Sequence, residues 1–586
     1  MNEPIAPEPH LAEYIVIVVY MVFLASVGPL MRKFNSNSDD YFRGGARTSW
    51  WLMGPSLTLS MVSAYVFTGV AGAIYEAGIA PLASNAAQWV AAIILIAFLA
   101  AWFRQMRMIT GAEVIRERFG PGTEQFFAYL SMVLQPMFGA FQLLGLSIFV
   151  SAVFQIPLEG VILGLGVVVG VYSVSGGKWA VMATDFLQSL VLFPVIIAVS
   201  VLGVIEVGGV ANLYREVVDL GSYEVAYPRG AFPDGKYTVA WIIAIFSMQF
   251  VAQLQLGWSA RFFVAKDGNE ARKAAALMLA IMVLGLFFFT TPSFVSRVLY
   301  PEQVASYAGV LNKAEESAYV VACLNLLPNG LLGMVLVAMF SATASSMDTG
   351  LNANAATIVR NIMPPLRRRF KMTPLDAQTE MVWGKRISAV LAVVIVSITL
   401  FLANFGRSGI FELIVGFAAA VNFPMTLPFF LALFARNAPR ACAVYSIVFG
   451  LGGQWVAKPI LAAMDISLDY PERVLMVAVF SVSGFMLSYV FAKRETPEQK
   501  AETDRFYAKM HKPVNFREEV GDDNDKEQLK TIGGMSIIIG LLMTSLLIVP
   551  NDWQSRLTIL AMGGSVLLLG SLLVWLSLRV LKRDKS

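Results

Sequence analysis

Long apolar runs, each near the roughly 20 residues that a helix needs to cross a bilayer, recur from one end of this chain to the other. Segments inside a bilayer must be helical, because their backbone groups find no water to bind there. The chain is 57% hydrophobic and only 14% charged, whereas soluble domains carry about 25% charged residues. The sequence therefore predicts an all-α polytopic membrane protein.

We expect fifteen membrane-spanning helices. They fall near residues 13–31, 50–76, 81–103, 124–154, 157–175, 179–206, 237–260, 273–298, 329–360, 382–403, 409–435, 441–463, 472–492, 532–550 and 555–580. Several of these spans exceed 25 residues, which favours tilted or broken helices, or helices that extend beyond the bilayer.

Basic residues gather in alternate connections between these spans. Short cytoplasmic loops are enriched in Lys and Arg. If the N-terminus lies outside, all strongly basic loops lie inside, while the longer loops 207–236 and 299–328 lie outside with balanced charge. The inner loops carry Arg32, Lys33, Arg43, Arg47, Arg104, Arg107, Arg116, Arg118, Lys178, Arg367, Arg368, Arg369, Lys371, Arg436 and Arg440. We therefore expect a multi-pass protein of the cell membrane, of the bacterial inner-membrane type, with its C-terminus in the cytoplasm.

The segments on either side of the expected core differ in composition, which predicts their location. Residues 1–49 are expected to hold an extracellular N-terminus, a first helix and a cytoplasmic loop. The first apolar run lacks the positive leader and the cleavage site of a signal peptide, so we expect it to be retained. Residues 441–492 predict two peripheral helices, residues 493–531 a polar cytoplasmic loop, and residues 532–586 two C-terminal helices with a basic tail.

Residue types needed for common enzyme chemistry are missing or scattered. Cys323 and Cys442 have no metal or redox spacing, and His10 and His511 lie in polar stretches. The sequence has no phosphate-binding glycine loop and no placeable Ser/His/Asp set. We expect neither an enzyme nor a nucleic-acid partner, and we expect no transport driven by ATP bound to this chain.

Hydroxyl residues form one face of the span 329–360. Ala342, Ser345 and Ser346 stand at i, i+3 and i+4 of a helix. Small residues of this kind tighten helix packing in membranes. They also suit sodium, which binds neutral oxygens, if a second, broken helix supplies freed carbonyls. Both interpretations stay open from spacing alone.

The span 50–76 is a candidate for that broken helix. Ser60, Ser63, Gly69 and Gly72 interrupt an otherwise apolar helix that also contains Pro55. These residues predict a kink or an unwound segment, although glycines here also serve close packing.

Other polar residues inside the spans are candidates because burying them in a bilayer is costly. Asp185 and Asp348 are the clearest ionisable ones, and the alternative for each is a hydrated carboxylate near the cytoplasmic end of its span. Gln249 and Gln253 share a helix face, where they either bind a solute or join helices. Asn422 precedes Pro424, which predicts a second interrupted helix or only a bend.

Five stretches resemble the sodium:solute symporter family, which includes sodium–glucose and sodium–proline transporters. They are SMVSAYVFTGVAGAIYEAGI, MITGAEVIRERFG, YSVSGGKWAVMATDFLQ, RFFVAKDGNEARKAA and FSATASSMDTGLNANAATIV. The resemblance as a whole spans roughly residues 13–460. The resemblance implies an inverted-repeat fold of the LeuT type. Two five-helix repeats would occupy residues 50–206 and 237–435, with one helix before them and about four after.

The resemblance also implies a sodium site between the first and eighth core helices. Its ligands would be the carbonyls of Leu59, Val62 and Ala342 and the hydroxyls of Ser345 and Ser346. Asp185 matches an acidic residue on the inward exit path of the ion. Ser63, Ser346 and Asp185 are candidates for a second sodium, but Val66 and Ala342 replace hydroxyl positions, which argues against it.

The solute positions of the family are not kept. Val66 stands where sugar transporters have a Gln in the first core helix, Met248 and Val251 replace residues of the sixth, and Met61 stands where proline transporters have an Asp. The polar residues that remain as solute-binding candidates are Ser63, Tyr65, Asn85, Gln88, Gln249, Gln253 and Asn422.

We therefore expect a sodium-coupled secondary symporter that imports a small organic solute by alternating access. Its partners would be sodium, the solute and the lipid bilayer. One alternative is a proton-coupled carrier with Asp185 as the proton site. Another is a transporter-like membrane sensor that reports a ligand to a partner.

Overall fold

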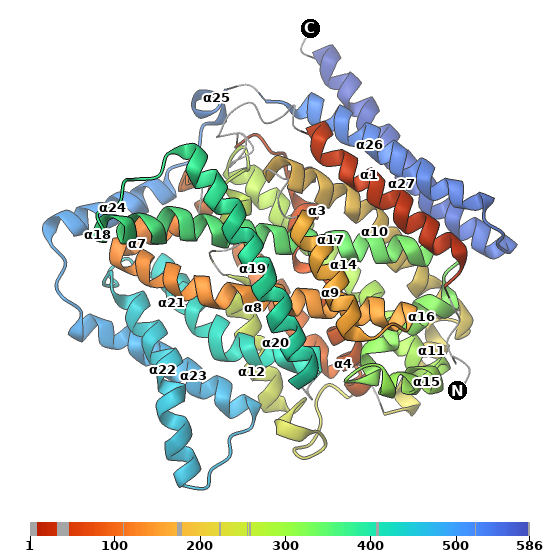
Figure 1. The fold of residues 1–586 in the computed structure, drawn as a ribbon, viewed down its shortest axis with the longest axis horizontal. Helices are drawn as coiled ribbons and strands as arrows, with labels where there is room; N and C mark the ends of the chain where they lie inside the picture. The colour runs from red at the N-terminus through yellow and green to blue at the C-terminus, as the bar shows by residue number, and fades with distance from the viewer. Residues whose placement is uncertain are drawn as a thin grey trace.

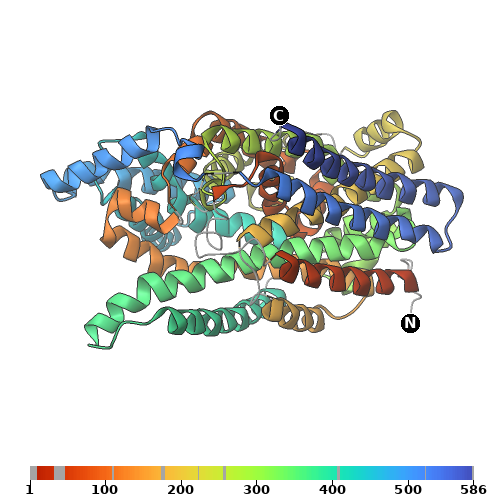
Figure 2. The same ribbon diagram turned by 90° about the horizontal axis from the view of Figure 1, so that it is seen from above.

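The computed structural model describes residues 9–31, 46–108, 111–172, 178–221, 224–254, 256, 259–405, 409–521 and 523–583. Within these ranges the chain is almost wholly helical, and its only recorded β pairing is a single bridge between Thr48 and Ala265. Figure 1 shows the helices gathered into one bundle, and Figure 2 shows the same bundle turned by 90°.

Each of the fifteen expected spans contains helix within the described residues. In chain order they are α1 (Leu11–Met31), α3 with η3 and α4 (Trp50–Met61, Val66–Val70, Ala71–Ala77), α5 with η5 and α6 (Ala83–Ile94, Leu95–Leu99, Ala100–Gln105), α8 (Pro121–Phe154), α9 (Leu158–Tyr172), α10 (Lys178–Glu206), α12 (Val239–Gln253), α14 (Gly268–Leu299), α17 (Leu331–Thr357), α19 (Ala377–Phe405), α20 with η11 and α21 (Ile410–Phe417, Ala418–Asn422, Phe423–Phe434), α22 (Cys442–Ala463), α23 (Tyr470–Phe491), α26 (Asp525–Ser545) and α27 (Trp553–Arg583). Among the described residues, nine helices are long and apolar enough to cross a membrane, and the bent pair α3–α4 makes a tenth.

The middle of the bundle is formed by α3, α10, α14 and α17, of which α3 and α10 each pack against the other three. The first helix α1 and the C-terminal pair α26–α27 pack on α10, whereas α22 and α23 pack on α21 and α12. Helices on the periphery expose apolar side chains such as Leu568 and Val393, which is expected for helices that face lipid.

The second span is broken in its middle. α3 ends at Met61, the helix resumes at Val66, and the two parts are bent by 61°. Pro55 lies inside α3 and does not mark the break. The unwound residues instead include Ser63, so the predicted interruption is present, and it falls at the hydroxyl residues rather than at the proline.

The polar stretch 493–531 contains α24 (Pro497–His511), α25 (Phe516–Glu519) and the start of α26. α24 begins where Thr496 and Gln499 bond each other's backbone N–H groups, a reciprocal cap that fixes the first turn. Its apolar side packs on α6 and on α7 (Gly111–Phe119). Figures 1 and 2 both place α24 at the opposite end of the molecule from α26–α27.

Ion pairs attach this stretch to three separate parts of the chain. Asp525 pairs with Lys266, just before α14, at 2.5 Å. Asp504 pairs with Arg436 at 2.7 Å and Glu502 with Arg440 at 2.7 Å, just beyond α21. Glu519 pairs with Arg107, just beyond α6, at 2.6 Å. The stretch therefore bridges the expected first and second repeats at one end of the bundle.

Glycines let α26 and α27 approach backbone to backbone. A Cβ atom on Gly540 would lie 2.8 Å from the backbone nitrogen of Leu567, and one on Gly570 would lie 2.8 Å from that of Ile537. Close approach through small residues is the usual way in which membrane helices associate without a hydrophobic driving force.

Gly563 and its neighbour Gly564 test this packing. A Cβ on Gly563 would lie 2.9 Å from the backbone nitrogen of Thr544, whereas one on Gly564 meets no atom within 4 Å. We expect Gly563→Ala to destabilise the protein by about 1–3 kcal/mol, because the two helices must separate. Gly564→Ala is the matched control and should leave the thermal unfolding midpoint in detergent unchanged. Equal midpoints for the two variants would contradict the packing.

Candidate functional site

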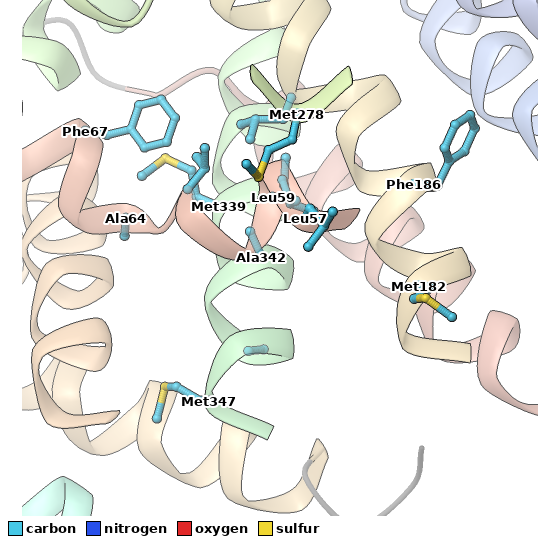
Figure 3. Packing of buried hydrophobic residues seen from close by; sticks show 14 of the residues in the cluster. Leu57, Leu59, Ala64, Phe67, Met182, Phe186, Met278, Met339, Ala342 and Met347 are labelled. Carbon is cyan, nitrogen blue, oxygen red and sulfur yellow. The ribbon is translucent and has the colours of Figure 1, made fainter. Parts of the chain in front are cut away.

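The break in the second span lies against α17. The backbone N–H of Ala64 donates a hydrogen bond to Thr343 Oγ1, at 3.4 Å, across that contact. Figure 3 shows Ala342 on α17 beside Leu59 at the end of α3. The two chain segments that carry the expected sodium ligands therefore meet in the middle of the bundle.

The backbone of the break supplies oxygen atoms. α3 ends because Val62 turns to an extended conformation, with φ −96° and ψ 114°. The N–H of Val62 still donates to the carbonyls of Thr58 and Leu59, at 3.2 and 3.1 Å. The last carbonyls of any helix lack the usual donor one turn further on. Secondary transporters bind ions with such freed carbonyls at broken helices.

The hydroxyl face of α17 is turned toward the same region. Ser346 is partly buried and stands one turn after Thr343, on the same side of the helix. Ser345 is part of α17, but its side chain lies outside the part of the chain that the structure describes. Thr343 is fully buried and was missed by the sequence analysis, although its spacing from Ser346 would have placed it on this face.

Asp185 is held in an ion pair. Its Oδ2 atom lies 3.0 Å from Arg261 Nη1 and accepts a hydrogen bond from Ser56 Oγ at 2.7 Å. Arg261 also donates to Ser56 Oγ at 2.6 Å. Asp185 is 2% exposed, so the alternative of a hydrated carboxylate at the end of the span is wrong.

The ion pair and Ser56 together join three elements near the break. Asp185 lies on α10, Ser56 on α3 and Arg261 on α13 (Ser259–Phe262). The guanidinium already balances the carboxylate, so the pair supplies no free negative charge for a second cation. Neither Ser56 nor Arg261 was singled out in the sequence, because each becomes a partner only through a contact between distant segments.

The solute candidates divide between the break and the helices around it. Ser63 and Tyr65 belong to the break, Asn85 and Gln88 to α5, Gln249 and Gln253 to α12, and Asn422 to η11. α5 and α12 pack against each other. Gln253 Oε1 is buried and has no hydrogen-bond partner among the described residues, whereas Asn422 Oδ1 accepts from Thr426 at 3.3 Å.

Aromatic rings surround the break on the side of α20. The Tyr65 ring stacks on Phe411, with centroids 6.4 Å apart and planes inclined by 15°. Trp241 contacts Phe411 at 6.4 Å and Tyr470 at 6.3 Å. Phe411, Trp241 and Tyr470 are all buried, so they form a continuous aromatic wall above Tyr65.

The helix near Asn422 is widened rather than interrupted. Residues Ala418–Asn422 form a π-helical turn between α20 and α21. Pro424 has no N–H to donate to the carbonyl of Ala420, four residues earlier. Gln454 of α22 donates to that carbonyl at 2.9 Å instead. The prediction of an interrupted helix here is therefore wrong, because a side chain from another helix pairs the freed backbone oxygen.

These features define a helical membrane protein with a broken helix at its centre, an arrangement that secondary transporters use. The chain matches the model of the sodium:solute symporter family over residues 41–450, which is well over half of its length. The chain belongs to the sodium:solute symporter family.

Curated relatives agree with this membership. The chain is 27% identical over 483 residues to sodium/glucose cotransporter 4 of Mus musculus, covering 75% of this chain and 68% of that protein. It is 26% identical over 492 residues to sodium/glucose cotransporter 1 of Sus scrofa, covering 77% and 72%. It is 23% identical over 492 residues to sodium/myo-inositol cotransporter 2 of Oryctolagus cuniculus, covering 77% and 71%.

A solved structure supports the fold. The substrate-bound, outward-open state of a Na⁺-coupled sialic acid symporter superposes with a TM-score of 0.66 at 19% identity, covering 83% of this chain and 99% of that one. The predicted LeuT-type architecture is confirmed, and the chain is a multi-pass membrane protein that performs sodium-coupled solute symport. The family and the relatives are transporters rather than enzymes. The ligand assignments and the boundaries of the repeats stay predictions.

A double-mutant cycle tests the ion pair of Asp185. We expect Asp185→Asn to destabilise the protein by about 3–5 kcal/mol, because Arg261 loses the carboxylate that balances its buried charge. The double variant with Arg261→Gln should be more stable than the sum of the two single losses implies. Thermal unfolding of the four proteins in detergent gives the coupling. Strictly additive losses would show that the two side chains do not interact.

Proposed function

We propose that the transporter imports its solute together with sodium bound where α3 breaks against α17. The ligands are the carbonyls of Leu59, Val62 and Ala342 and the hydroxyls of Ser345 and Ser346. One observation carries this assignment. The hydrogen bond from Ala64 to Thr343 holds the freed backbone of the break against the hydroxyl face of α17.

The energy for uptake comes from the ion. Each sodium that moves inward contributes about 2.3 kcal/mol per 100 mV of membrane potential, in addition to its concentration gradient. Coupling requires that sodium and the solute favour the same conformation, so each raises the affinity of the other. Sodium at the break and a solute beside Tyr65 would both stabilise one arrangement of the unwound residues.

The orientation that we propose places the N-terminus outside and the C-terminus in the cytoplasm of a cell with an inner membrane of the bacterial type. The basic loops support it, because the arginines that bind the stretch 493–531 all belong to connections on one side. In this orientation α24 lies at the cytoplasmic end, and the end of α4 and the start of α20 lie outside.

The solute that we propose is neutral and rich in hydrogen-bonding groups. The candidates near the break are hydroxyls and amides, namely Ser63, Tyr65, Asn85, Gln88, Gln249, Gln253 and Asn422, and none of them carries a charge. The stacked rings of Tyr65 and Phe411 offer an apolar face beside these groups. The names of the relatives, which mention glucose and myo-inositol, support a neutral polyhydroxy compound.

The proton-coupled alternative receives no support at Asp185. That role requires a carboxylate that exchanges protons with water, but Asp185 is buried against Arg261 and Ser56. The sensor alternative is not favoured by any described feature, since the family and the relatives are transporters.

Removing the two hydroxyls tests the sodium site. We expect the double variant Ser345→Ala, Ser346→Ala to lose at least about tenfold in apparent sodium affinity, since a loss of about 1.4 kcal/mol of binding energy has that effect. Solute uptake into proteoliposomes is measured at a series of sodium gradients, with a pH gradient as comparison. Ser397→Ala is the control, because its hydroxyl bonds only within its own helix and is exposed. An unchanged dependence of uptake on sodium would contradict the assignment of Ser345 and Ser346 as sodium ligands.

A stability screen identifies the solute. Neutral sugars and polyols are compared with carboxylates, amino acids and nucleosides, each with and without sodium. We expect a neutral compound to raise the thermal unfolding midpoint of the purified protein only when sodium is present, because a ligand stabilises the state that binds it. Stabilisation by a charged solute alone would overturn the proposed solute class.

A further inference from the structure

Five ionisable side chains meet where the end of α4 approaches the start of α20. We name Glu76, Lys236, Lys313, Glu316 and Glu412 the outer cluster. They come from four different places in the fold: the end of α4, the connection before α12, the region of η9 (Ala314–Ser317), and the first turn of α20. None of them belongs to the sodium site or to the solute candidates.

Two lysines and two carboxylates of the outer cluster balance each other. Glu412 Oε1 lies 2.5 Å from Lys236 Nζ and 2.6 Å from Lys313 Nζ. Lys313 Nζ is also 3.8 Å from Glu76 Oε1, and Glu76 Oε2 accepts a hydrogen bond from the Tyr237 hydroxyl at 3.2 Å. These contacts join α4 and α20 to the connection before α12 and to the loop before η9, next to the aromatic wall.

Glu316 is the fifth member and has no cation of its own. It is 2% exposed, and its Oε1 atom accepts a hydrogen bond from the Ile410 N–H at 2.5 Å, at the start of α20. Its Oε2 atom is buried and has no hydrogen-bond partner among the residues that the structure describes. A Cβ on Gly409 would lie 2.7 Å from Glu316 Oε1 and 2.8 Å from Glu412 Oε2, so the two carboxyl groups flank this glycine closely.

The surroundings of Glu316 do not compensate for a further negative charge. The ionisable groups of the elements packed around it are Lys313 and Glu315 beside or on η9, Glu412 on α20, Tyr75 and Glu76 on α4, Tyr65 beside η3, Glu124 and Tyr129 on α8, Lys236 before α12, Glu302 on α15 (Pro301–Ala305), Tyr307 on η8 (Ser306–Gly309), and Tyr319 and Cys323 on α16 (Ala318–Leu326). The two lysines are already shared by Glu76 and Glu412. An ionised Glu316 would therefore leave the outer cluster with an excess negative charge.

Burial first, and the nearby carboxylates Glu412 and Glu315 to a smaller extent, raise the pKa of Glu316 to about 8, although the Ile410 N–H and Lys313 lower it. A carboxyl group that is buried beside other carboxylates keeps its proton, because its charged form is poorly solvated and repelled. Near neutral pH this carboxyl group is therefore protonated while the cluster is assembled.

We propose that Glu316 is a proton-binding site whose protonated form completes the closed outer cluster, and that opening of the outer side releases this proton to the extracellular water. The inference rests on the proposed function, because alternating access requires the outer side to open. Opening must part the segments that the cluster joins. Glu316 then meets water, and its carboxyl group returns toward its ordinary pKa of 4.5.

The direction of the pH effect follows from the difference between the pKa of Glu316 in the closed state and its pKa in the open state. Between about pH 4.5 and about pH 8 the closed state holds a proton that the open state does not. Proton binding therefore favours the closed state as the external pH falls. As the pH rises through this window, the population of the open state increases relative to that of the closed state. The increase is complete above about pH 8, where both states have lost the proton.

Distances between spin labels on the full-length protein in lipid nanodiscs test the proposal. Val225→Cys and Val310→Cys place one label on the connection that carries Lys236 and one on the loop before η9, both at exposed positions. The native Cys323 and Cys442 are buried. Without sodium or solute, we expect the ratio of open to closed distances to rise by up to about tenfold per pH unit below pH 8 and then to level off.

Glu316→Gln should abolish this pH response and keep the outer side closed, since glutamine retains the hydrogen bond but cannot ionise. Glu302→Gln is the matched control, because Glu302 is exposed on α15, and it should respond like the unmodified chain. Lys313→Met is a second, independent variant. It removes the cation that opposes proton binding, so the upper end of the pH response should move to higher pH.

The proposal is overturned if the distances in the Glu316→Gln variant still depend on pH. It is also overturned if the pH at which the open-to-closed ratio levels off is the same in Lys313→Met as in the unmodified chain. The distances are measured without transport, so they are independent of the sodium assignment. If sodium drives no uptake while the distances still depend on Glu316, the proposed coupling fails and the proton site stands.

Discussion

The architecture depends on giving every backbone polar group a partner where a helix is interrupted, because the apolar surroundings offer no water. Three irregular points, namely the break after α3, the π-helical turn before α21 and the start of α17, show three solutions. Ala64 in the break bonds to Thr343, the freed carbonyl of Ala420 bonds to Gln454, and the first N–H groups of α17 are capped by the carboxylate of Glu13. Each solution takes a side chain from a different helix. The irregular segments therefore fix the relative positions of the helices around them.

Charge pairs also join separate segments, and they do so at three places in the bundle. The outer cluster joins four segments, Asp185 and Arg261 join three elements together with Ser56, and the stretch 493–531 binds three parts of the chain. The pairs of that stretch are the most exposed, so water and salt screen them most. Buried pairs such as Asp185–Arg261 depend instead on keeping both partners in place.

The sequence was sufficient to predict the helices and the broken span, because both depend on local composition. Apolar length determines where a helix can cross a bilayer, and the hydroxyl residues near Ser63 mark where the helix is interrupted. Thr343, Arg261 and Glu316 were not found in this way. Their roles arise from contacts between segments far apart in the chain, and no local pattern encodes which distant group will lie opposite. Asn422 shows the reverse case, since its local signal predicted an interruption that Gln454 prevents.

The π-helical turn Ala418–Asn422 changes which way the two halves of its helix face. Phe411 and Phe429 are eighteen positions apart, so on a regular helix of 3.6 residues per turn they would point in the same direction. One additional residue in a turn rotates everything beyond it by about 100°. Phe411 accordingly stacks on Tyr65, whereas Phe429 packs edge-on against Phe119 and Phe127. A single continuous helix can thus present one half to Tyr65 at the break and the other half to α7 and α8.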